Sequence, residues 1–488
     1  MRLKVLSGKE TREFTCHAGE NLLGFLRAQG YAISARCGGN GKCGKCRVRV
    51  IEGDLPAGKD GFVLSCTARI EGDAFIEVFE SEGGGLTQTY SSALETDGED
   101  GFGVALDIGT TTLAFALIDM KTGKEKEKFG VLNRQGAYGA DVLSRIAAAD
   151  GGNAKALQDC ILAQTRDALS RFSKMIPDGR VRRLAVCGNT TMLHLFLGKD
   201  VHGIGQYPFR AAFLDTVRIA GSELGLDAEE VVLLPSVAAY FGADAVAGGL
   251  AAGVCGGVCL LADIGTNGEM LLHANGKLYA TSTAAGPCFE GANIACGTGG
   301  VAGAIDSVSE KDGKISYTVI GGGEATGICG AGLIDAVALM LKKGIIDETG
   351  AFTGGVQRFY VSEKVYVSQE DVRNFQLAKS AICAGIRVLL SEAGVSFSEL
   401  EKLYVAGGLG FYLDPANAVA VGLFPSELAA KLEVVGNTAL AGTTECLLSR
   451  EKLREAERIA RSAEYVDLSC SPAFMDAYIE NMDFGNKI

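Results

Sequence analysis

A four-residue motif that occurs twice, far apart in the chain, restricts the folds open to this sequence. The motif DIGT stands at residues 107–110 and again at 263–266. Each copy ends an apolar run typical of a buried strand and is followed by a second apolar run and a turn that contains Gly-Lys. Because the repeated unit has the size of a domain, the duplication predicts two similar α/β lobes that face each other.

The repeated turns carry the groups that phosphate binding requires. A carboxylate at a strand end can hold a Mg2+–water shell, a glycine allows a tight turn, and threonine hydroxyls and amides can donate to phosphoryl oxygens. One such turn is a weak signal, whereas two copies in facing repeats are a much stronger one. We therefore predict a phosphate site in which Asp107 and Asp263 are catalytic. The other ligands predicted from the two turns are Gly109, Thr110, Thr111, Gly265, Thr266 and Asn267.

Other segments could complete a nucleotide site. In the segment 404–415, YVAGGLGFYLDP, three glycines follow a predicted strand, where backbone can lie against a flat base or ribose. Asp335 could reach a ribose hydroxyl, and Asn189 and Thr190 end a strand at an edge expected to face the nucleotide. Each glycine patch has the alternative reading of an ordinary strand-to-helix turn. The glycines of the first segment are Gly407, Gly408 and Gly410.

A framework of four cysteines lies near the N-terminus with the spacing C-x5-C-x2-C-x19-C. Plant-type ferredoxins use C-x4-C-x2-C and a distant fourth cysteine, and glycines between the ligands let the backbone curl around inorganic sulfide. A zinc site usually shows two short Cys or His pairs, whereas only one is present here. The pattern therefore favours a [2Fe-2S] cluster over zinc, with Cys16 as a packed thiol. The predicted ligands are Cys37, Cys43, Cys46 and Cys66.

Both parts of the chain resemble known folds. Residues 1–80, with GENLLGFLRAQGYAISARCGGNGKCGKCRVRVIEG, resemble the β-grasp ferredoxins. Residues 103–488 resemble the ASKHA superfamily, which includes actin and sugar kinases. The resemblance implies an α/β fold with ATP bound between lobe I (103–256) and lobe II (257–488), the latter ending in a helical tail. The polar, Gly/Ser-rich and acidic residues 81–102 predict a flexible linker.

The combination of a ferredoxin domain and an ASKHA ATPase resembles the ATP-dependent reductive activators of corrinoid proteins. Matching segments include GVALDIGTTTLAFALID, AVCGNTTMLHLFLG, LADIGTNGEM, GPCFEGANIACG and VAGGLGFYLDPANAVAVGL. The resemblance implies an enzyme that uses ATP, Mg2+ and a [2Fe-2S] cluster to reduce the inactive Co(II) corrinoid protein of a methyltransferase system to Co(I). It further implies an external low-potential electron donor and a homodimer. The short linker, Cys288 and the run GTGGVAGAID depart from the family pattern and leave the partner's identity open.

Composition excludes several other classes of protein. The net charge of −13 argues against a nucleic-acid partner. The N-terminus lacks an apolar core of signal-peptide length, and the uncharged run 245–262 contains five glycines, so a buried strand and loop fit it better than a membrane span. Fifteen cysteines favour metal ligation or buried thiols in a cytoplasmic protein without a membrane partner.

Other functions stay open at this point. The chain could reduce another low-potential metalloenzyme, could be a small-molecule kinase with a regulatory ferredoxin domain, or could be a non-enzymatic redox sensor. Asp244 either orients water or caps a helix, and His194 fits a core-facing or capping side chain better than a catalyst. The basic residues Arg36, Lys42 and Lys45 form either a docking rim for an acidic partner or a solvated surface.

Overall fold

The structure is a computed structural model of the 488-residue chain. It describes residues 1–7, 10–29, 31, 33, 46–56, 61–78 and 94–484. Two of the predicted cluster ligands, Cys37 and Cys43, lie outside the described residues, as do the basic rim residues Arg36, Lys42 and Lys45. None of the helices in the described ranges is long and apolar enough to cross a membrane.

The N-terminal part forms a mixed five-stranded sheet in the order β2-β1-β5-β3-β4. Alternation in β1 buries Leu3 and Val5, which pack with Leu22 and Leu26 of helix α1. β1 runs parallel to β5 and antiparallel to β2. The elements are β1 (Arg2–Ser7), β2 (Glu10–Thr15), α1 (Leu22–Ala28), β3 (Arg47–Gly53), β4 (Phe62–Leu64) and β5 (Ala74–Val78).

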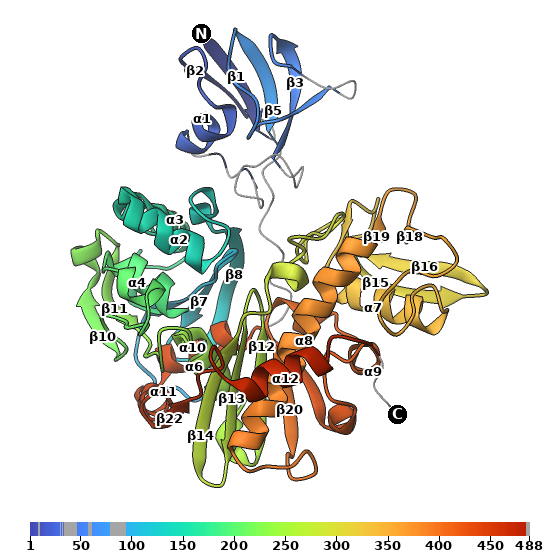
Figure 1. The fold of residues 1–488 in the computed structure, drawn as a ribbon. Coiled ribbons are helices and arrows are strands. Elements are labelled where there is room, and N and C mark those ends of the chain that lie inside the picture. The colour runs from blue at the N-terminus through green and yellow to red at the C-terminus, as the bar shows by residue number, and fades with distance from the viewer. Residues whose placement is uncertain are drawn as a thin grey trace.

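The predicted duplication is present as two six-stranded sheets in which five strands have the same arrangement and the sixth lies at opposite edges, which confirms the two-lobed α/β fold (Figure 1). In each sheet three consecutive strands form an antiparallel meander, and a further strand pairs in parallel with the first of them. These pairs are β9 with β6 and β20 with β12. The first sheet has the order β10-β11-β9-β6-β7-β8 and the second β21-β20-β12-β13-β14-β22. The first contains β6 (Phe102–Ile108), β7 (Thr112–Asp119), β8 (Lys124–Leu132), β9 (Val181–Gly188), β10 (Val217–Ala220) and β11 (Ala228–Leu233). The second contains β12 (Cys259–Ile264), β13 (Gly268–Ala274), β14 (Lys277–Thr283), β20 (Lys402–Ala406), β21 (Leu432–Gly436) and β22 (Ala463–Tyr465).

Helices and two small sheets surround the large sheets. The helices are α2 (Val142–Ala148), α3 (Ala154–Ser173), α4 (Thr190–Leu197), α5 (His202–Gly205), α6 (Ala243–Ala251), α7 (Gly330–Lys342), α8 (Gln369–Glu392), α9 (Pro415–Ala420), α10 (Thr438–Leu448), α11 (Arg450–Ser462) and α12 (Pro472–Glu480). The small sheets comprise β15 (Ala304–Lys311), β16 (Lys314–Val319) and β17 (Gly327–Ile328), and β18 (Arg358–Tyr360) with β19 (Tyr366–Ser368).

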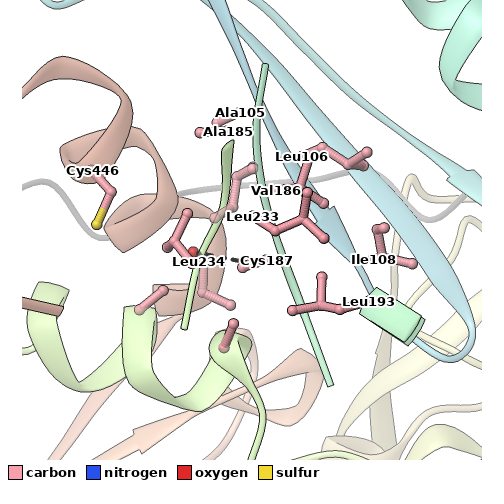
Figure 2. Packing of buried hydrophobic residues seen from close by; sticks show 14 of the residues in the cluster. Ala105, Leu106, Ile108, Ala185, Val186, Cys187, Leu193, Leu233, Leu234 and Cys446 are labelled. Atoms are coloured by element: carbon pink, nitrogen blue, oxygen red, sulfur yellow. Dashed lines mark hydrogen bonds between the residues drawn. The ribbon is translucent and has the colours of Figure 1, made fainter. Parts of the chain in front are cut away.

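Helix α10 belongs to the second half of the sequence but packs against the first sheet. Its Cys446 is buried in the same cluster as Leu106 and Val186 (Figure 2). A Cβ atom at Gly442 of α10 would lie 1.9 Å from the carbonyl oxygen of Ala247 in α6, so only glycine allows this close approach of the two helices. The core of the first lobe therefore depends on residues that belong to lobe II in the sequence.

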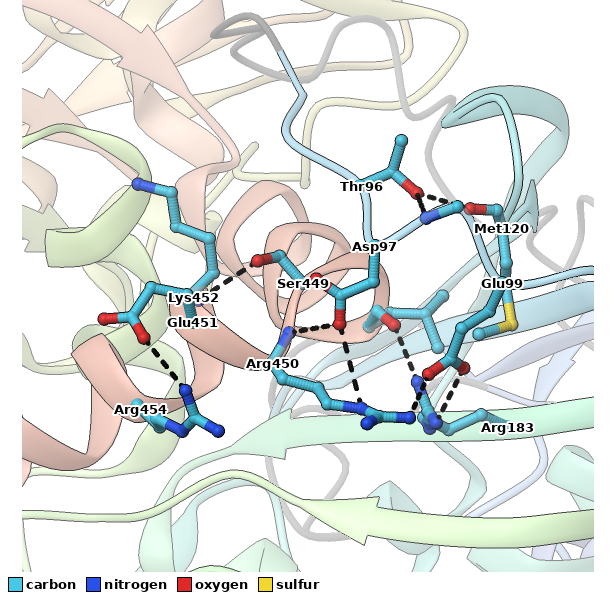
Figure 3. Close-up of polar contacts among 12 residues, drawn as sticks. Thr96, Asp97, Glu99, Met120, Arg183, Ser449, Arg450, Glu451, Lys452 and Arg454 are labelled. Carbon is cyan, nitrogen blue, oxygen red and sulfur yellow. Dashed lines mark hydrogen bonds and ion pairs between the residues drawn. The ribbon is translucent and has the colours of Figure 1, made fainter.

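The segment 94–100 is held against the start of α11 (Figure 3). The amide of Asp97 donates to the carbonyl of Leu448 at 3.0 Å. Glu99 accepts from both Arg450, at 2.5 Å, and Arg183, at 3.0 Å. A flexible linker is predicted over 81–102. The bonds of Asp97 and Glu99 to arginines hold the last part of that range in place. Residues 79–93 lie outside the described residues.

The two arginines of this anchor should differ in their effect on stability. The Arg183 side chain is 17% exposed and bonds Glu99, Glu230 and a carbonyl, whereas that of Arg450 is 65% exposed. We expect Arg183→Met to lower the free energy of unfolding by about 2–3 kcal/mol, because it removes the more buried of the two arginine partners of both Glu99 and Glu230. Arg450→Met should cost less than about 1 kcal/mol. Urea denaturation followed by circular dichroism checks the difference, and equal effects would contradict it.

Candidate functional site

The two DIGT turns stand at the ends of β6 and β12. In each turn the glycine amide donates back across the loop, from Gly109 to the carbonyl of Thr112 at 3.0 Å and from Gly265 to that of Asn267 at 2.9 Å. A Cβ atom at Gly109 would lie 2.6 Å from the Thr112 carbonyl oxygen, which explains the need for glycine there. The strands thus present Asp107 on one sheet and Asp263 on the other, next to tight turns.

Asp107 is held in place from two sides. Its Oδ2 accepts from Asn437 Nδ2 at 3.4 Å, and its Oδ1 lies 3.6 Å from Cys187 Sγ. Burial raises the pKa of Asp107 to about 6, and the bonds from Asn437 and Cys187 limit the rise. Asn437 also caps α10, since its Oδ1 accepts from the amide of Leu440. The position of the first carboxylate is therefore coupled to the start of α10.

Three further carboxyl groups, partly buried like Asp107, belong to the same cluster of interacting charges. Burial and, to a smaller extent, the neighbouring carboxylates raise the pKa of Asp263 to about 7 and that of Asp244 to about 8. The pKa of Glu269 is raised well above its usual range by burial and then by Asp244 and Asp263. Asp244 is not the N-cap of α6, a position taken by Gly242, so the structure places it in the cluster instead.

This donor set fits a divalent cation, because a cation would offset the mutual repulsion of the carboxylates. Among the described residues, no group of three or more His, Cys, Asp or Glu side chains has the arrangement to bind a metal ion directly. The cluster therefore suits a hydrated Mg2+, held through its water shell, better than a fully dehydrated one.

One carboxylate connects the two repeated turns. Glu290 Oε2 accepts from Thr111 Oγ1 at 3.0 Å and from Thr266 Oγ1 at 2.9 Å. Thr111 belongs to the first turn and Thr266 to the second, so the turns face each other within reach of a single side chain. A phosphoryl group, which also accepts through several oxygens, could take the same hydroxyls.

A buried arginine supports the first turn from behind. Arg145 of α2 is 1% exposed, and its guanidinium donates to the carbonyl of Thr110 at 2.5 Å and to that of Gly139 at 3.0 Å. Burial lowers the pKa of Arg145 to about 10, while the charges of Asp141 and Glu290 oppose the shift. A fixed positive charge therefore lies beside the predicted phosphate turn.

The remaining predicted ligands fall into two groups. Gly407 has a φ of +91°, and a Cβ atom there would lie 2.6 Å from Asp263 Oδ1, so this glycine abuts the second turn. Gly408 faces open space, and Gly410 lies in the same 3-10 turn, η6 (Gly408–Phe411). Asn189 caps α4 and donates to Thr110 Oγ1 at 3.3 Å, and Asn267 donates to Glu269 at 3.2 Å.

Thr190 and Asp335 instead make contacts within the protein. The Thr190 hydroxyl donates to the carbonyl of Ala238 at 2.7 Å. Asp335 is 3% exposed, and its two oxygens accept from Asn417 Nδ2 at 2.8 Å and from the amide of Val308 at 3.0 Å. These bonds join α7 to α9 and β15, so the structure gives the predicted ribose contact of Asp335 no support.

His194 has a structural role, as its sequence context favours. The ring is fully buried and stacks on Phe213 at 4.2 Å, and its Nδ1 lies 2.7 Å from the carbonyl of Thr190. Its Nε2 accepts from the amides of Ala212 and Phe213. The neutral ring therefore carries its proton on Nδ1 and ties the 206–213 loop to α4.

Protonation of His194 should destabilise the fold. Burial lowers its pKa below the ordinary 6.5, so the unfolded chain binds a proton that the folded chain does not. The free energy of unfolding should therefore fall as the pH drops below about 6.5. The His194→Ala variant should lack this part of the pH dependence. That variant should also lose about 2–4 kcal/mol at pH 8 through the cavity. Denaturation at pH 5 and 8, with the exposed His202→Ala as control, tests this, and an unchanged pH slope would contradict it.

The described part of the cluster site brings two cysteines together. Arg47 of β3 pairs with Leu64 of β4, so Cys46 and Cys66 stand at the same end of this hairpin. Ser65 donates to the carbonyl of Cys46 through its amide, at 2.9 Å, and its hydroxyl, at 2.8 Å. Asn21 Nδ2 donates to the carbonyl of Cys66 at 2.8 Å. Two buried thiols that are distant in sequence thus fit adjacent ligands of a cluster.

Sequence reasoning missed several residues of the nucleotide site. They are Arg145, Cys187, Glu269, Glu290 and Asn437. Arg145 and Glu290 belong to segments typical of the resembled family, but nothing in their local spacing distinguishes them from surface residues. Their partners are remote in sequence, so only the packed lobes show the contacts.

The sheets and the paired turns define an ASKHA-type ATPase joined to a ferredoxin-like domain, and comparisons with known proteins agree. Residues 5–71 match the 2Fe-2S iron-sulfur cluster binding domain, 102–255 the RACo middle region, and 257–487 the C-terminal ASKHA domain of RACo. The corrinoid activation enzyme RamQ of Eubacterium limosum is 32% identical over 420 residues, covering 79% of this chain and 71% of that protein.

Two further relatives extend the comparison. The Co(II) methylated amine-specific corrinoid protein reductase of Methanosarcina barkeri is 28% identical over 422 residues, covering 78% of this chain and 77% of its own length. The solved structure of a reductive activator for a corrinoid, iron-sulfur protein has a TM-score of 0.73 at 28% identity and covers 99% of this chain and 98% of that one. The chain belongs to this family of reductive activators of corrinoid proteins, which confirms the resemblance noted in its sequence.

Proposed function

We propose that this protein uses ATP to drive the transfer of one electron to the inactive Co(II) corrinoid protein of a methyltransferase system, which yields Co(I). The main support for this proposal is that the two phosphate turns meet at Glu290, beside a cluster of carboxylates. In the same chain, the N-terminal β3–β4 hairpin brings Cys46 and Cys66 together. The relatives named for corrinoid activation support the choice of partner. The [2Fe-2S] cluster supplies the one-electron chemistry when it is bound.

The residues of the nucleotide site divide the work of binding ATP. Asp107 and Asp263 would hold a hydrated Mg2+, which would supply positive charge to the phosphates. Thr111 and Thr266 donate hydroxyls to phosphoryl oxygens from opposite lobes. Gly407, with open space beside Gly408, leaves room for the base and ribose.

Helix α10 is placed to transmit nucleotide binding toward the ferredoxin domain. Its N-cap Asn437 contacts Asp107, and the carbonyl of Leu448 at its other end accepts from Asp97. Arg450, just beyond α10, bonds Glu99 in the segment that leads back to the N-terminal domain. A change in lobe closure that shifts α10 would therefore displace this anchor, a rigid-body coupling of the hinge type.

A direct assay tests the proposed function. Protein with a chemically reduced cluster, MgATP and a Co(II) corrinoid protein should develop the Co(I) absorbance band, and the same mixture without ATP should not. ATP hydrolysis without a Co(I) band for any corrinoid protein, although the cluster is intact, would favour reduction of another low-potential metalloenzyme. A phosphorylated small molecule formed without a protein partner would favour the kinase.

Other parts of the proposal are predictions from the family resemblance and from composition. We expect an external low-potential protein to reduce the cluster, and we expect a homodimer. A cytoplasmic location stays a prediction from the sequence. Equilibrium sedimentation of the full chain, with and without MgATP, tests the dimer, and a monomer in both states would contradict it.

A further inference from the structure

We propose that Glu290 is a catalytic residue of ATP hydrolysis, which orients the water that attacks the γ-phosphate and accepts its proton. The inference deepens the proposed function, since it rests on the same nucleotide site. It concerns a residue that neither phosphate turn contains.

The position of Glu290 follows from its contacts with both turns. Its Oε2 accepts from the hydroxyls of Thr111 and Thr266, at 3.0 and 2.9 Å. These hydroxyls belong to the turns that cradle phosphates in the proposed function, one from each lobe. A group that touches both must lie where the end of the triphosphate meets the two lobes, within hydrogen-bond reach of a water beside the γ-phosphate.

The backbone that carries Glu290 is firmly held. Glu290 ends the 3-10 turn η5 (Pro287–Glu290), whose Phe289 is 4% exposed and packs edge-on against Phe375 at 5.7 Å. The next residue, Gly291, has a φ of +77°, and a Cβ atom there would lie 2.2 Å from the carbonyl oxygen of Thr298. A side chain on such a fixed support can hold a water in one geometry, which is the main task in phosphoryl transfer.

The other acidic residues of the site are less suited to this task. Asp107 already accepts from Asn437 and Cys187, and Glu269 accepts from Asn267. Asp263 abuts Gly407, on the side where the nucleoside is placed. Glu290 alone among these carboxylates accepts from hydroxyls of both turns in the described structure.

The step balances without a redox change. The water oxygen forms a bond to Pγ while its proton passes to the Glu290 carboxylate. The bond between Pγ and the bridging oxygen breaks, and its electron pair stays on the β-phosphate of ADP. Glu290 then returns the proton to the departing phosphate or to solvent. The products are ADP and inorganic phosphate.

Glu290→Gln tests the inference, because glutamine keeps an oxygen that can accept from the threonine hydroxyls but cannot take a proton. The turnover rate of ATP hydrolysis should fall by about 10²–10⁴-fold. ATP affinity, measured by equilibrium binding, should stay within a few-fold of wild type, and so should iron content. The matched control Glu324→Gln, at an exposed carboxylate paired with Lys364, should leave all three unchanged.

A second variant distinguishes chemistry from a structural effect. Glu290→Ala should lose turnover as well, and added formate should restore part of it by supplying a carboxylate in the space left by the side chain. Hydrolysis by Glu290→Gln within threefold of wild type, or a loss fully explained by weaker ATP binding, would overturn the inference. If wild type hydrolyses ATP with this dependence on Glu290 yet yields no Co(I), the catalytic role stands and the proposed function fails.

Discussion

Cys66→Ala should abolish the [2Fe-2S] cluster and, with it, all ATP-dependent production of Co(I). A cluster of this type needs all four thiolates, and the structure places Cys66 beside Cys46 at the end of the β3–β4 hairpin. Iron and sulfide content and the visible absorption of the purified protein measure the loss. The hydrolysis of ATP should persist, because the nucleotide site lies in lobes I and II of the ATPase part and not in the ferredoxin-like domain.

Cys16→Ala is the matched control in the same domain. Cys16 is 3% exposed, its thiol donates to the carbonyl of Met1 at 3.5 Å, and burial raises its pKa, all of which suit a packed thiol. This variant should retain its iron and its Co(I) production. A Cys66→Ala protein that still bound a full complement of iron would show that the fourth ligand lies elsewhere.

Asp263→Asn should reduce the rate of ATP hydrolysis by at least about 100-fold, and Co(I) production should fall with it. The substitution removes one of the charges that position Mg2+ and keeps the size of the side chain. It should not destabilise the fold, because it relieves repulsion in a cluster where burial and neighbouring carboxylates raise the pKa of Asp263 to about 7. Steady-state phosphate release and thermal denaturation measure the two effects.

Asp335→Asn provides the comparison for this second variant. Asp335 is also a buried carboxylate of the ATPase part, but it bonds Val308 and Asn417. Its replacement should change stability and leave ATP affinity and turnover near wild type. A marked loss of ATP affinity in Asp335→Asn would instead restore the ribose contact predicted from sequence, and an active Asp263→Asn would exclude that residue from the site.

The predictable part of this protein is the part encoded by local patterns. The two DIGT motifs predict two similar lobes, because apolar strand, glycine turn and second strand are each specified by adjacent residues. The cysteine spacing predicts a [2Fe-2S] site for the same reason. The end of the linker is less predictable from sequence. Composition cannot show that Glu99 bonds Arg183 or that Asp97 bonds Arg450.

By itself, then, the sequence determines the family and the duplicated fold, and it predicts Asp107, Asp263 and the cluster cysteines as site residues. Tertiary structure alone decides which further groups complete the site. Glu290 bonds Thr111 across 179 residues and Asn437 bonds Asp107 across 330, contacts that no local spacing can signal. It also shows that Asp335 bonds Val308 and Asn417, while its predicted ribose contact stays a prediction. The physical reason is that a site between two lobes is assembled by the packing of the lobes, and the order of the chain does not record which side chains meet there.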